Sequence, residues 1–346
     1  MTMPEEIHFR IHDVNLLLRC DRREYLDAIA LIFSRYETSP VSAPDLRVNM
    51  IHADSFWGAE GNPAGGEALE TAMEKIGRRV FVGEDTVYVK GFVRYAGLSA
   101  RRRTQGSTMT YDMVYDQTFL DSDIGRGPYQ PCHQLIGIWP LATYLAKRRN
   151  MFFLHGGAAA FENRNIVFCG LQGVGKSTLL LRMLRSPEAR FLSDNIYFHD
   201  AERVYACPET IRLDAASLEL TGTPADLLVD TGRDSDLDRK MYVVNQRRTT
   251  ENFVPDLFIM PRFHPDKSAI LPAKEDASDL FMAFSELAME LNAYNQWGAP
   301  FLLQDGSFST KRLAALDGLL KQKPVYHLHI RKGDSPDSLL DLIRSV

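Results

Sequence analysis

One short stretch in the middle of the chain constrains its fold more than any other feature. Residues 170–177 read GLQGVGKS, which matches the pattern GxxxxGK[ST] at every fixed position. The apolar run NIVFCG comes directly before it, and a helix is expected from Ser177 to Leu184. A strand, a glycine-rich turn and a helix in this order predict an α/β core. In it, backbone N–H groups and a helix N-terminus face an anion.

The pattern gives a candidate role to every residue of the stretch. The candidate phosphate-binding residues are Gly170, Leu171, Gln172, Gly173, Val174, Gly175, Lys176, Ser177 and Thr178. We expect Lys176 to contact the β and γ phosphates of a nucleoside triphosphate, and the hydroxyl of Ser177 to bind Mg²⁺. A nucleoside triphosphate and Mg²⁺ are therefore the expected cofactors. The alternative interpretation is a glycine-rich turn with a solvated lysine.

The chain is long enough for two domains, and its pattern changes near residue 150. Before that point, alternating segments such as IHFRIHDV and TVYVKGFVRY predict an antiparallel sheet, with helical spacing over 22–36. We expect an N-terminal α+β domain over 1–150, with a role in binding the acceptor. A nucleotide-binding and catalytic domain is expected over 151–346. An amphipathic helix over 131–149 is expected to lead into it.

The second half of the chain predicts a hairpin followed by further strands and helices. MFFLHGGAAAF and NIVFCG, joined by a turn at 162–164, are expected to pair. FLSDNIYF (191–198) predicts one strand, 278–294 an amphipathic helix, and VYHLHI (325–330) a late strand. The acidic, glycine-containing segment 229–238 is expected to be a mobile surface loop.

Charge and cysteine usage exclude several classes of protein. The formal net charge is −5, and no apolar run reaches membrane-spanning length, so neither a nucleic-acid nor a membrane partner is expected. The four cysteines are widely spaced, without a CxxC pair, which indicates neither a zinc site nor a disulfide framework. The N-terminal MTMPEEIHFR lacks the basic and apolar runs of a signal peptide. We expect a cytoplasmic protein.

The surroundings of the glycine-rich stretch resemble a known family. The order LHGGAAAF, IVFCGLQGVGKST, FLSDNIYF and CPETIRLD is similar to the HPr kinase/phosphorylase family, which includes kinases of peptide-modification clusters. The resemblance covers 151–346, and its specific part covers 151–214. It implies a P-loop α/β core related to ATP-dependent phosphoenolpyruvate carboxykinase. It also implies transfer of the γ-phosphoryl group of ATP to a serine hydroxyl of a protein or peptide.

The same resemblance implies roles for two residues outside the loop. His155 falls on the family's histidine beside the transferred phosphate, and the alternative is a histidine of the core. Asp194 falls where the family has a pair of aspartates, one of which is the base on the acceptor hydroxyl. This chain has only one carboxylate there, in Ser193-Asp194-Asn195. Asp194 is therefore a candidate catalytic base, a candidate metal ligand, or the cap of a turn.

Further charged residues complete the candidate site. Glu209 and Arg212 resemble the family's Glu and Arg beyond the aspartate strand, where the carboxylate helps to hold Mg²⁺. The alternative is a surface strand pair. Arg239 and Lys240 follow the acidic segment, and Lys240 is expected to contact the γ phosphate. The alternative for this pair is solvated charge.

Three functions remain open at this point: a protein or peptide kinase, a small-molecule kinase acting on free serine or a sugar, and a P-loop NTPase or nucleotide-binding regulator. No NKxD motif follows the loop and no LSGGQ-like stretch occurs, which argues against a small GTPase and an ABC-type ATPase. A homo-oligomer is compatible with the resemblance. The basic tract 101–103 either docks an acidic acceptor or forms an exposed turn.

Overall fold

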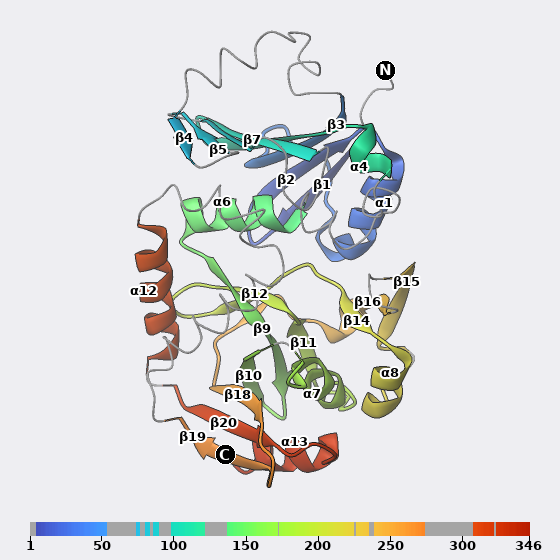
Figure 1. Cartoon of the computed structure of the whole chain (residues 1–346), viewed down its shortest axis with the longest axis vertical. Helices are drawn as coiled ribbons and strands as arrows, with labels where there is room; N and C mark the ends of the chain where they lie inside the picture. The colour runs from blue at the N-terminus through green and yellow to red at the C-terminus, as the bar shows by residue number, and fades with distance from the viewer. Residues whose placement is uncertain are drawn as a thin grey trace. The chain divides into compact units, whose positions relative to one another are not determined.

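The computed structural model divides the chain into two compact units. The residues that it describes are 5–53, 74–76, 80–83, 86–89, 98–121, 137–171, 173–224, 226–234, 239–273, 307–321 and 323–346. The first unit takes in Met1–Arg148 with Ala293–Gly306, and the second Arg149–Asn292 with Ser307–Val346. Each unit combines helices with a sheet that has both parallel and antiparallel pairs, so the fold class is α/β (Figure 1).

The first unit is built on an eight-stranded sheet in the order β1-β2-β3-β8-β7-β6-β5-β4. Its strands are β1 (Glu5–Ile11), β2 (Val14–Cys20), β3 (Leu46–His52), β4 (Glu74–Ile76), β5 (Val80–Val82), β6 (Thr86–Val89), β7 (Leu98–Gln105) and β8 (Thr108–Tyr115). Its helices are α1 (Arg23–Ile32), η1 (Ser34–Tyr36), α4 (Gln117–Asp121) and α6 (Trp139–Arg149).

The predicted antiparallel sheet is wrong in part. β2 pairs with β3 in parallel, and β3 pairs with β8 in parallel, while the other described pairs of this sheet are antiparallel. The cause is α1, which follows β2 and carries the chain back so that β3 starts at the same edge. The helix itself agrees with the helical spacing predicted over 22–36. Its apolar residues Tyr25, Leu26 and Ile29 are buried.

Helix α6 is buried on all sides over its first eight residues, from Trp139 to Ala146. The helix predicted over 131–149 is therefore confirmed from Trp139 onward, but its predicted amphipathic character is wrong in that part. Residues 131–136 lie outside the described residues. Trp139 belongs to the core.

The basic tract at 101–103 lies in the middle of β7 and is not an exposed turn. Arg101 and Arg102 are buried. Nη2 of Arg101 lies 3.3 Å from Oδ2 of Asp112 on the neighbouring strand, and Nη2 of Arg103 lies 2.6 Å from the same oxygen. Asn49 on β3 donates to the other carboxylate oxygen at 2.7 Å. The arginines therefore belong to a polar network within the sheet.

The second unit holds a nine-stranded sheet in the order β17-β13-β12-β9-β10-β18-β20-β19, with β11 also paired with β9, and a three-stranded sheet β14-β16-β15. Its strands are β9 (Phe152–Phe161), β10 (Arg164–Cys169), β11 (Arg190–Ser193), β12 (Ile196–His199), β13 (Val204–Ala206), β14 (Ile211–Leu213), β15 (Leu228–Asp234), β16 (Lys240–Val244), β17 (Asn252–Phe253), β18 (Leu257–Phe263), β19 (Ala269–Pro272) and β20 (Val325–Ile330). Its helices are α7 (Lys176–Met183), α8 (Ala215–Thr221), η3 (Gln246–Arg248), α12 (Phe308–Leu320) and α13 (Pro336–Arg344). No helix within the described ranges combines the length and the apolar character needed to cross a membrane.

The hairpin predicted at β9 and β10 is confirmed. Glu162 and Asn163 form its two-residue turn with φ of 49° and 62°, which is the backbone twist that tight hairpins favour. Side chains alternate along β10, so Ile166 packs with α7 on one face of the sheet and Val167 packs with α12 on the other. The sheet is therefore covered on both faces (Figure 1).

The segment FLSDNIYF forms two strands, whereas the sequence predicts one. β11 ends at Ser193 and β12 begins at Ile196, and both pair with β9. Asn195 between them has φ of 75°, a left-handed conformation that breaks an extended chain. Asp194 therefore lies in the turn between β11 and β12, alongside β9.

The mobile loop predicted over 229–238 is wrong for its first half. Residues 228–234 form β15, which pairs with β16 in antiparallel fashion, and 235–238 lie outside the described residues. The helix predicted over 278–294 lies outside the described residues as well. VYHLHI forms β20, as predicted.

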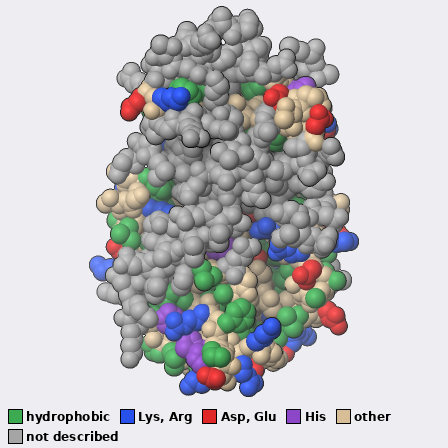
Figure 2. Space-filling model, viewed as in Figure 1, with side chains coloured by type: hydrophobic (Ala, Val, Ile, Leu, Met, Phe, Trp, Pro, Cys, Tyr) green, Lys and Arg blue, Asp and Glu red, His purple; other side chains and the backbone are tan. Residues whose placement is uncertain are grey.

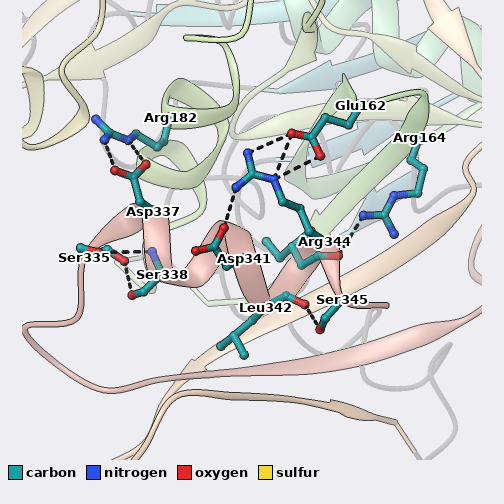
Figure 3. Close-up of polar contacts among 11 residues, drawn as sticks. Glu162, Arg164, Arg182, Ser335, Asp337, Ser338, Asp341, Leu342, Arg344 and Ser345 are labelled. Carbon is teal, nitrogen blue, oxygen red and sulfur yellow. Dashed lines mark hydrogen bonds and ion pairs between the residues drawn. The ribbon is translucent and has the colours of Figure 1, made fainter.

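Helix α13 forms ion pairs with α7 and with the β9–β10 turn (Figure 3). Arg182 in the last turn of α7 forms a two-point ion pair with Asp337, in which Nε donates to Oδ1 at 2.6 Å. At the other end of α13, Nη2 of Arg344 donates to Oε1 of Glu162 at 2.9 Å. The C-terminal helix thus contacts the helix that follows the glycine-rich loop and the turn that precedes β10.

Candidate functional site

The glycine-rich loop joins β10 to α7, as the sequence predicts. Gly173 and Gly175 have φ of +80° and +93°, in the left-handed region that favours glycine. Gly175 precedes the first helical residue, Lys176, and Val174 is buried. Gln172 lies outside the described residues. The turn therefore favours glycine at Gly175, a fixed position of the pattern, and at Gly173, a variable one. It leads into the N-terminus of an eight-residue helix.

The side chain of Lys176 turns back onto the loop. Its Nζ donates to the carbonyl oxygens of Gly170 at 2.9 Å and Leu171 at 2.8 Å. The lysine is buried, and this burial lowers its pKa, while the negative charge of Asp194 acts in the opposite direction. A buried cation beside a helix N-terminus is suited to bind a phosphate group.

Ser177 and Asp194 are in direct contact. Oγ of Ser177 donates to Oδ2 of Asp194 at 2.7 Å. Asp194 is buried, and burial raises its pKa, opposed by this hydrogen bond and by the positive charge of Lys176. A hydroxyl and a carboxylate in contact are oxygen ligands of the kind that Mg²⁺ binds together with phosphates and water.

Two glycines on β9 allow close approach of neighbouring elements: Gly157 allows that of α7, and Gly156 that of β10. A Cβ atom on Gly157 would lie 2.4 Å from Cδ1 of Leu180 on α7 and 3.3 Å from Oδ1 of Asp194. A Cβ atom on Gly156 would lie 2.2 Å from the carbonyl oxygen of Phe168. The partners of this close approach are the helix, the turn and the neighbouring strand.

His155 lies on β9, opposite Ile196 of β12, and lines the same pocket. It is 5% exposed. Burial, together with the positive charges of Lys176 and Arg212, lowers the pKa of His155 to about 3. The imidazole is therefore neutral at neutral pH, where it can accept or donate one hydrogen bond and carries no positive charge.

These side chains line a pocket of about 300 Å³. The loop and α7 contribute Gly173, Gly175, Lys176, Ser177 and Thr178. The β9 side contributes His155, Asp194 and Asn195. The third wall consists of Thr210, Arg212, Leu213, Asp214, Ser217 and Arg239. A concave site with several cations suits a phosphorylated ligand.

Several residues of the third wall are absent from the sequence prediction. Asp214 caps α8 by accepting from the backbone N–H of Ser217 at 2.7 Å, and an aspartate before a short helix is a recognisable capping signal. The two arginines of this wall, Arg212 and Arg239, are among the candidates from the sequence. Arg212 lies on β14, Arg239 directly precedes β16, and β16 pairs with β14. The wall is therefore assembled from segments that meet only in the folded chain.

Five predicted residues in the described part of the chain do not line the pocket, namely Gly170, Leu171 and Val174 of the loop, Glu209 and Lys240. Lys240 is exposed on β16, with its Nζ 3.4 Å from Oδ2 of Asp230. Glu209 is buried and accepts from Nδ2 of Asn195 at 2.8 Å, so it contacts the turn that carries Asp194. Within the described part of the chain, no group of three or more His, Cys, Asp or Glu side chains converges on a metal position.

Comparisons with known proteins add little to this geometry. No protein-family model and no curated protein sequence matches the chain. Among solved structures, the chain is similar to the Hpr(Ser) kinase/phosphatase from Coxiella burnetii, with 9% identity over 56% of this chain and 94% of that chain and a TM-score of 0.27. A similarity at this level carries no argument about function, so the proposals below depend on the pocket.

Proposed function

We propose that the chain binds the Mg²⁺ complex of a nucleoside triphosphate, with ATP as the expected nucleotide, and transfers its γ-phosphoryl group to a hydroxyl acceptor. The observation that carries this proposal is the hydrogen bond between Ser177 and Asp194. It joins a loop hydroxyl to a buried carboxylate at the N-terminus of α7, where the loop would hold the phosphates. A glycine-rich turn with a solvated lysine does not account for this contact.

The following pocket residues have a proposed role in binding Mg²⁺ or the phosphates. Ser177 and Asp194 would hold Mg²⁺, which when bound supplies positive charge against the phosphate oxygens. Lys176 would contact the β and γ phosphates from the loop. Arg212 and Arg239 add positive charge on the third wall, where it would stabilise the transferred group. The catalytic effect of such a site comes from positioning and electrostatics.

The contact with Ser177 favours the metal-side role of Asp194 over the role of base on the acceptor. Phosphoryl transfer passes through a loose transition state and leaves little covalent chemistry for the protein. His155 would orient the acceptor hydroxyl or a phosphate oxygen by a hydrogen bond, since its imidazole is neutral. Glu209 would act as a positioning residue, because it holds Asn195 beside Asp194.

The acceptor proposed here is a serine of a protein or peptide, with binding assisted by the region 1–150. A small molecule such as free serine or a sugar is the alternative acceptor of the same chemistry. One observation supports a P-loop NTPase or regulator instead: the β11–β12 break carries a single carboxylate, Asp194, and it is bonded to the loop. In that case water would be the acceptor.

The proposal is tested with ATP labelled on the γ phosphate, in the presence of Mg²⁺ and of candidate acceptors. Lys176→Ala should weaken ATP binding and abolish turnover, whereas Lys240→Ala, which removes an exposed lysine outside the pocket, should leave both unchanged. Label in an acceptor indicates a kinase, and label released as inorganic phosphate indicates an NTPase. ATP affinity and turnover of Lys176→Ala within about twofold of wild type, roughly 0.4 kcal/mol, would place the site elsewhere.

A further inference from the structure

Three neighbouring strands of the nine-stranded sheet run in the same direction. β10 pairs in parallel with β18, and β18 pairs in parallel with β20. The glycine-rich loop follows β10, so the carboxyl ends of β18 and β20 reach the same edge of the sheet as the loop. Both strands lie on the side of β10 away from β9, whereas Asp194 comes from the turn on the β9 side. The loop therefore has the ends of β18 and β20 on one side and the turn that carries Asp194 on the other.

The loop touches the ends of both parallel strands. A Cβ atom on Gly170 would lie 3.2 Å from the carbonyl oxygen of Pro261, near the end of β18. A Cβ atom on Gly175 would lie 4.0 Å from Cδ1 of Ile330, the last residue of β20. Adjacent strands are about 4.8 Å apart, so the two strand ends extend roughly 5 and 10 Å sideways from the loop.

Phe263, the last residue of β18, is exposed at this edge. Its side chain is 60% exposed, the largest value among the large hydrophobic residues of the described ranges. Leu257 and Ile259 of the same strand pack in the core cluster with α7, so Phe263 follows their alternation toward the α7 side. Figure 2 shows that hydrophobic side chains lie beside basic and histidine side chains over β18 and β20.

The loops beyond the two strands are bonded to each other. Asp334, in the loop after β20, accepts from Oγ of Ser268 at 2.6 Å and from Nε of Arg331 at 2.9 Å. Ser268 in turn accepts from the backbone N–H of Arg331 at 2.8 Å. Contacts of this kind hold the rim of the edge in place, which lowers the conformational entropy lost on binding.

We propose that the nucleoside of the bound nucleotide lies over the carboxyl ends of β18 and β20, with its base stacked on the ring of Phe263. This inference rests on the proposed function, because it takes the phosphates to lie in the loop. The γ phosphate would point to Asp194 on one flank, so the nucleoside extends to the other. Stacking on an aromatic ring tolerates every base, so this site discriminates weakly among nucleoside triphosphates.

The test compares two probes, Mg-ATP and Mg²⁺ with inorganic tripolyphosphate, which has the phosphates but no nucleoside. Phe263→Ala should weaken ATP binding about 5- to 150-fold and leave tripolyphosphate binding within about twofold, because one base stack is lost. Phe263→Leu, which keeps apolar bulk without the ring, should weaken ATP as well, and Phe263→Trp should retain it. Leu271→Ala, at a side chain 44% exposed on β19, is the matched control and should bind both probes as wild type does.

The two proposals fail in different ways. Wild-type affinity of Phe263→Ala for ATP, or equal weakening toward ATP and tripolyphosphate, would overturn the base site and leave the phosphate site standing. Equal affinity of the wild-type protein for Mg-ATP and for Mg²⁺ with tripolyphosphate would also overturn the base site and leave the phosphate site standing. Lys176→Ala should weaken both probes. A folded wild-type protein that binds neither probe would overturn the proposed function, and the base site with it.

Discussion

Asp112 in the first unit and Asp194 in the second are both buried, but different groups surround them. Asp112 lies on β8 within a continuous sheet, and side chains on both neighbouring strands donate to it. These donors are Asn49, Arg101 and Arg103. Asp194 lies in a turn, accepts from Ser177 and lines a pocket.

The difference separates a structural carboxylate from a candidate functional one. A buried charge is tolerated when partners compensate it, as they do at Asp112. Asp194 accepts from Ser177 and lines a polar pocket, and its burial is expected to cost stability that a bound ligand can offset. Burial alone therefore does not identify a site, whereas the pattern of partners does.

The largest effect should come from Asp194→Asn. The amide can still accept from Ser177, so the fold should persist, and removal of a buried charge should leave stability equal or higher at neutral pH. Mg-nucleotide turnover should fall about 10³-fold, which corresponds to about 4 kcal/mol. Turnover by steady-state kinetics and unfolding by denaturant measure the two effects.

Asp200→Asn is the matched control, because Asp200 follows β12 outside the pocket and accepts from the hydroxyl of Tyr205. It should keep wild-type turnover. Full turnover in a folded Asp194→Asn protein would show that Asp194, like Asp112, is a structural carboxylate. If Asp194→Asn loses turnover but still binds Mg-ATP with wild-type affinity, Asp194 is the base on the acceptor hydroxyl and not a metal ligand.

Asp112→Asn should show the opposite profile. It removes the anion between two arginines, one of them buried, and should lower the free energy of unfolding by about 3 kcal/mol, the lower part of the range for broken buried pairs because Arg103 is partly exposed. Nucleotide affinity of the folded fraction should not change. Denaturant unfolding followed alongside Mg-ATP titration checks both. Unchanged stability would show that the network contributes little.

Acidification should destabilise the second unit through its buried histidines. Burial lowers the pKa of His199 to about 4 from its ordinary 6.5. Between these values the unfolded chain takes up the proton first, so stability present above pH 6.5 is lost as the pH falls toward 4. His199→Gln should reduce the slope of unfolding free energy against pH by about 1.4 kcal/mol per unit in that window. An unchanged slope would contradict a neutral, buried His199.

The smallest effect is expected at Asp337, a carboxylate on the surface. Asp337→Asn breaks the ion pair with Arg182 shown in Figure 3, and surface pairs contribute about 0 to 1 kcal/mol. The free energy of unfolding should therefore fall by less than about 1 kcal/mol, with nucleotide binding unchanged. A larger loss, or loss of binding, would indicate that α13 positions α7 for the site.

Local patterns in the sequence predict the centre of the second unit well. The β9–β10 hairpin follows from two apolar runs and a two-residue turn, and the position of α7 follows from the glycine-rich motif. Both depend on neighbours in the sequence. The contact between Ser177 and Asp194 is not visible in the sequence, because a change of direction at Asn195 creates it. The dipeptide Asp-Asn, which tolerates left-handed geometry, is the one signal that was available.

Long-range pairing explains the remaining errors. The parallel pairing of β2 with β3 depends on a helical crossover, which a strand pattern does not reveal. The acidic, glycine-containing sequence of 229–238 predicts a loop, but pairing with β16 makes residues 228–234 a strand. Arg239 lines the pocket and Lys240 does not, because alternation along the chain sends consecutive residues to opposite sides.

Gly157 gives this pocket a particular evolutionary constraint. The space for a methyl group at this position is already filled by Leu180, and the nearest pocket atom is an oxygen of Asp194. A side chain at this position would therefore force the side chain of Leu180 to shift and would crowd the Asp194 carboxylate. A lineage that substitutes Gly157 is expected to need a compensating change at Leu180. Variation at the two positions is expected to be strongly epistatic, with few single-step paths between functional sequences.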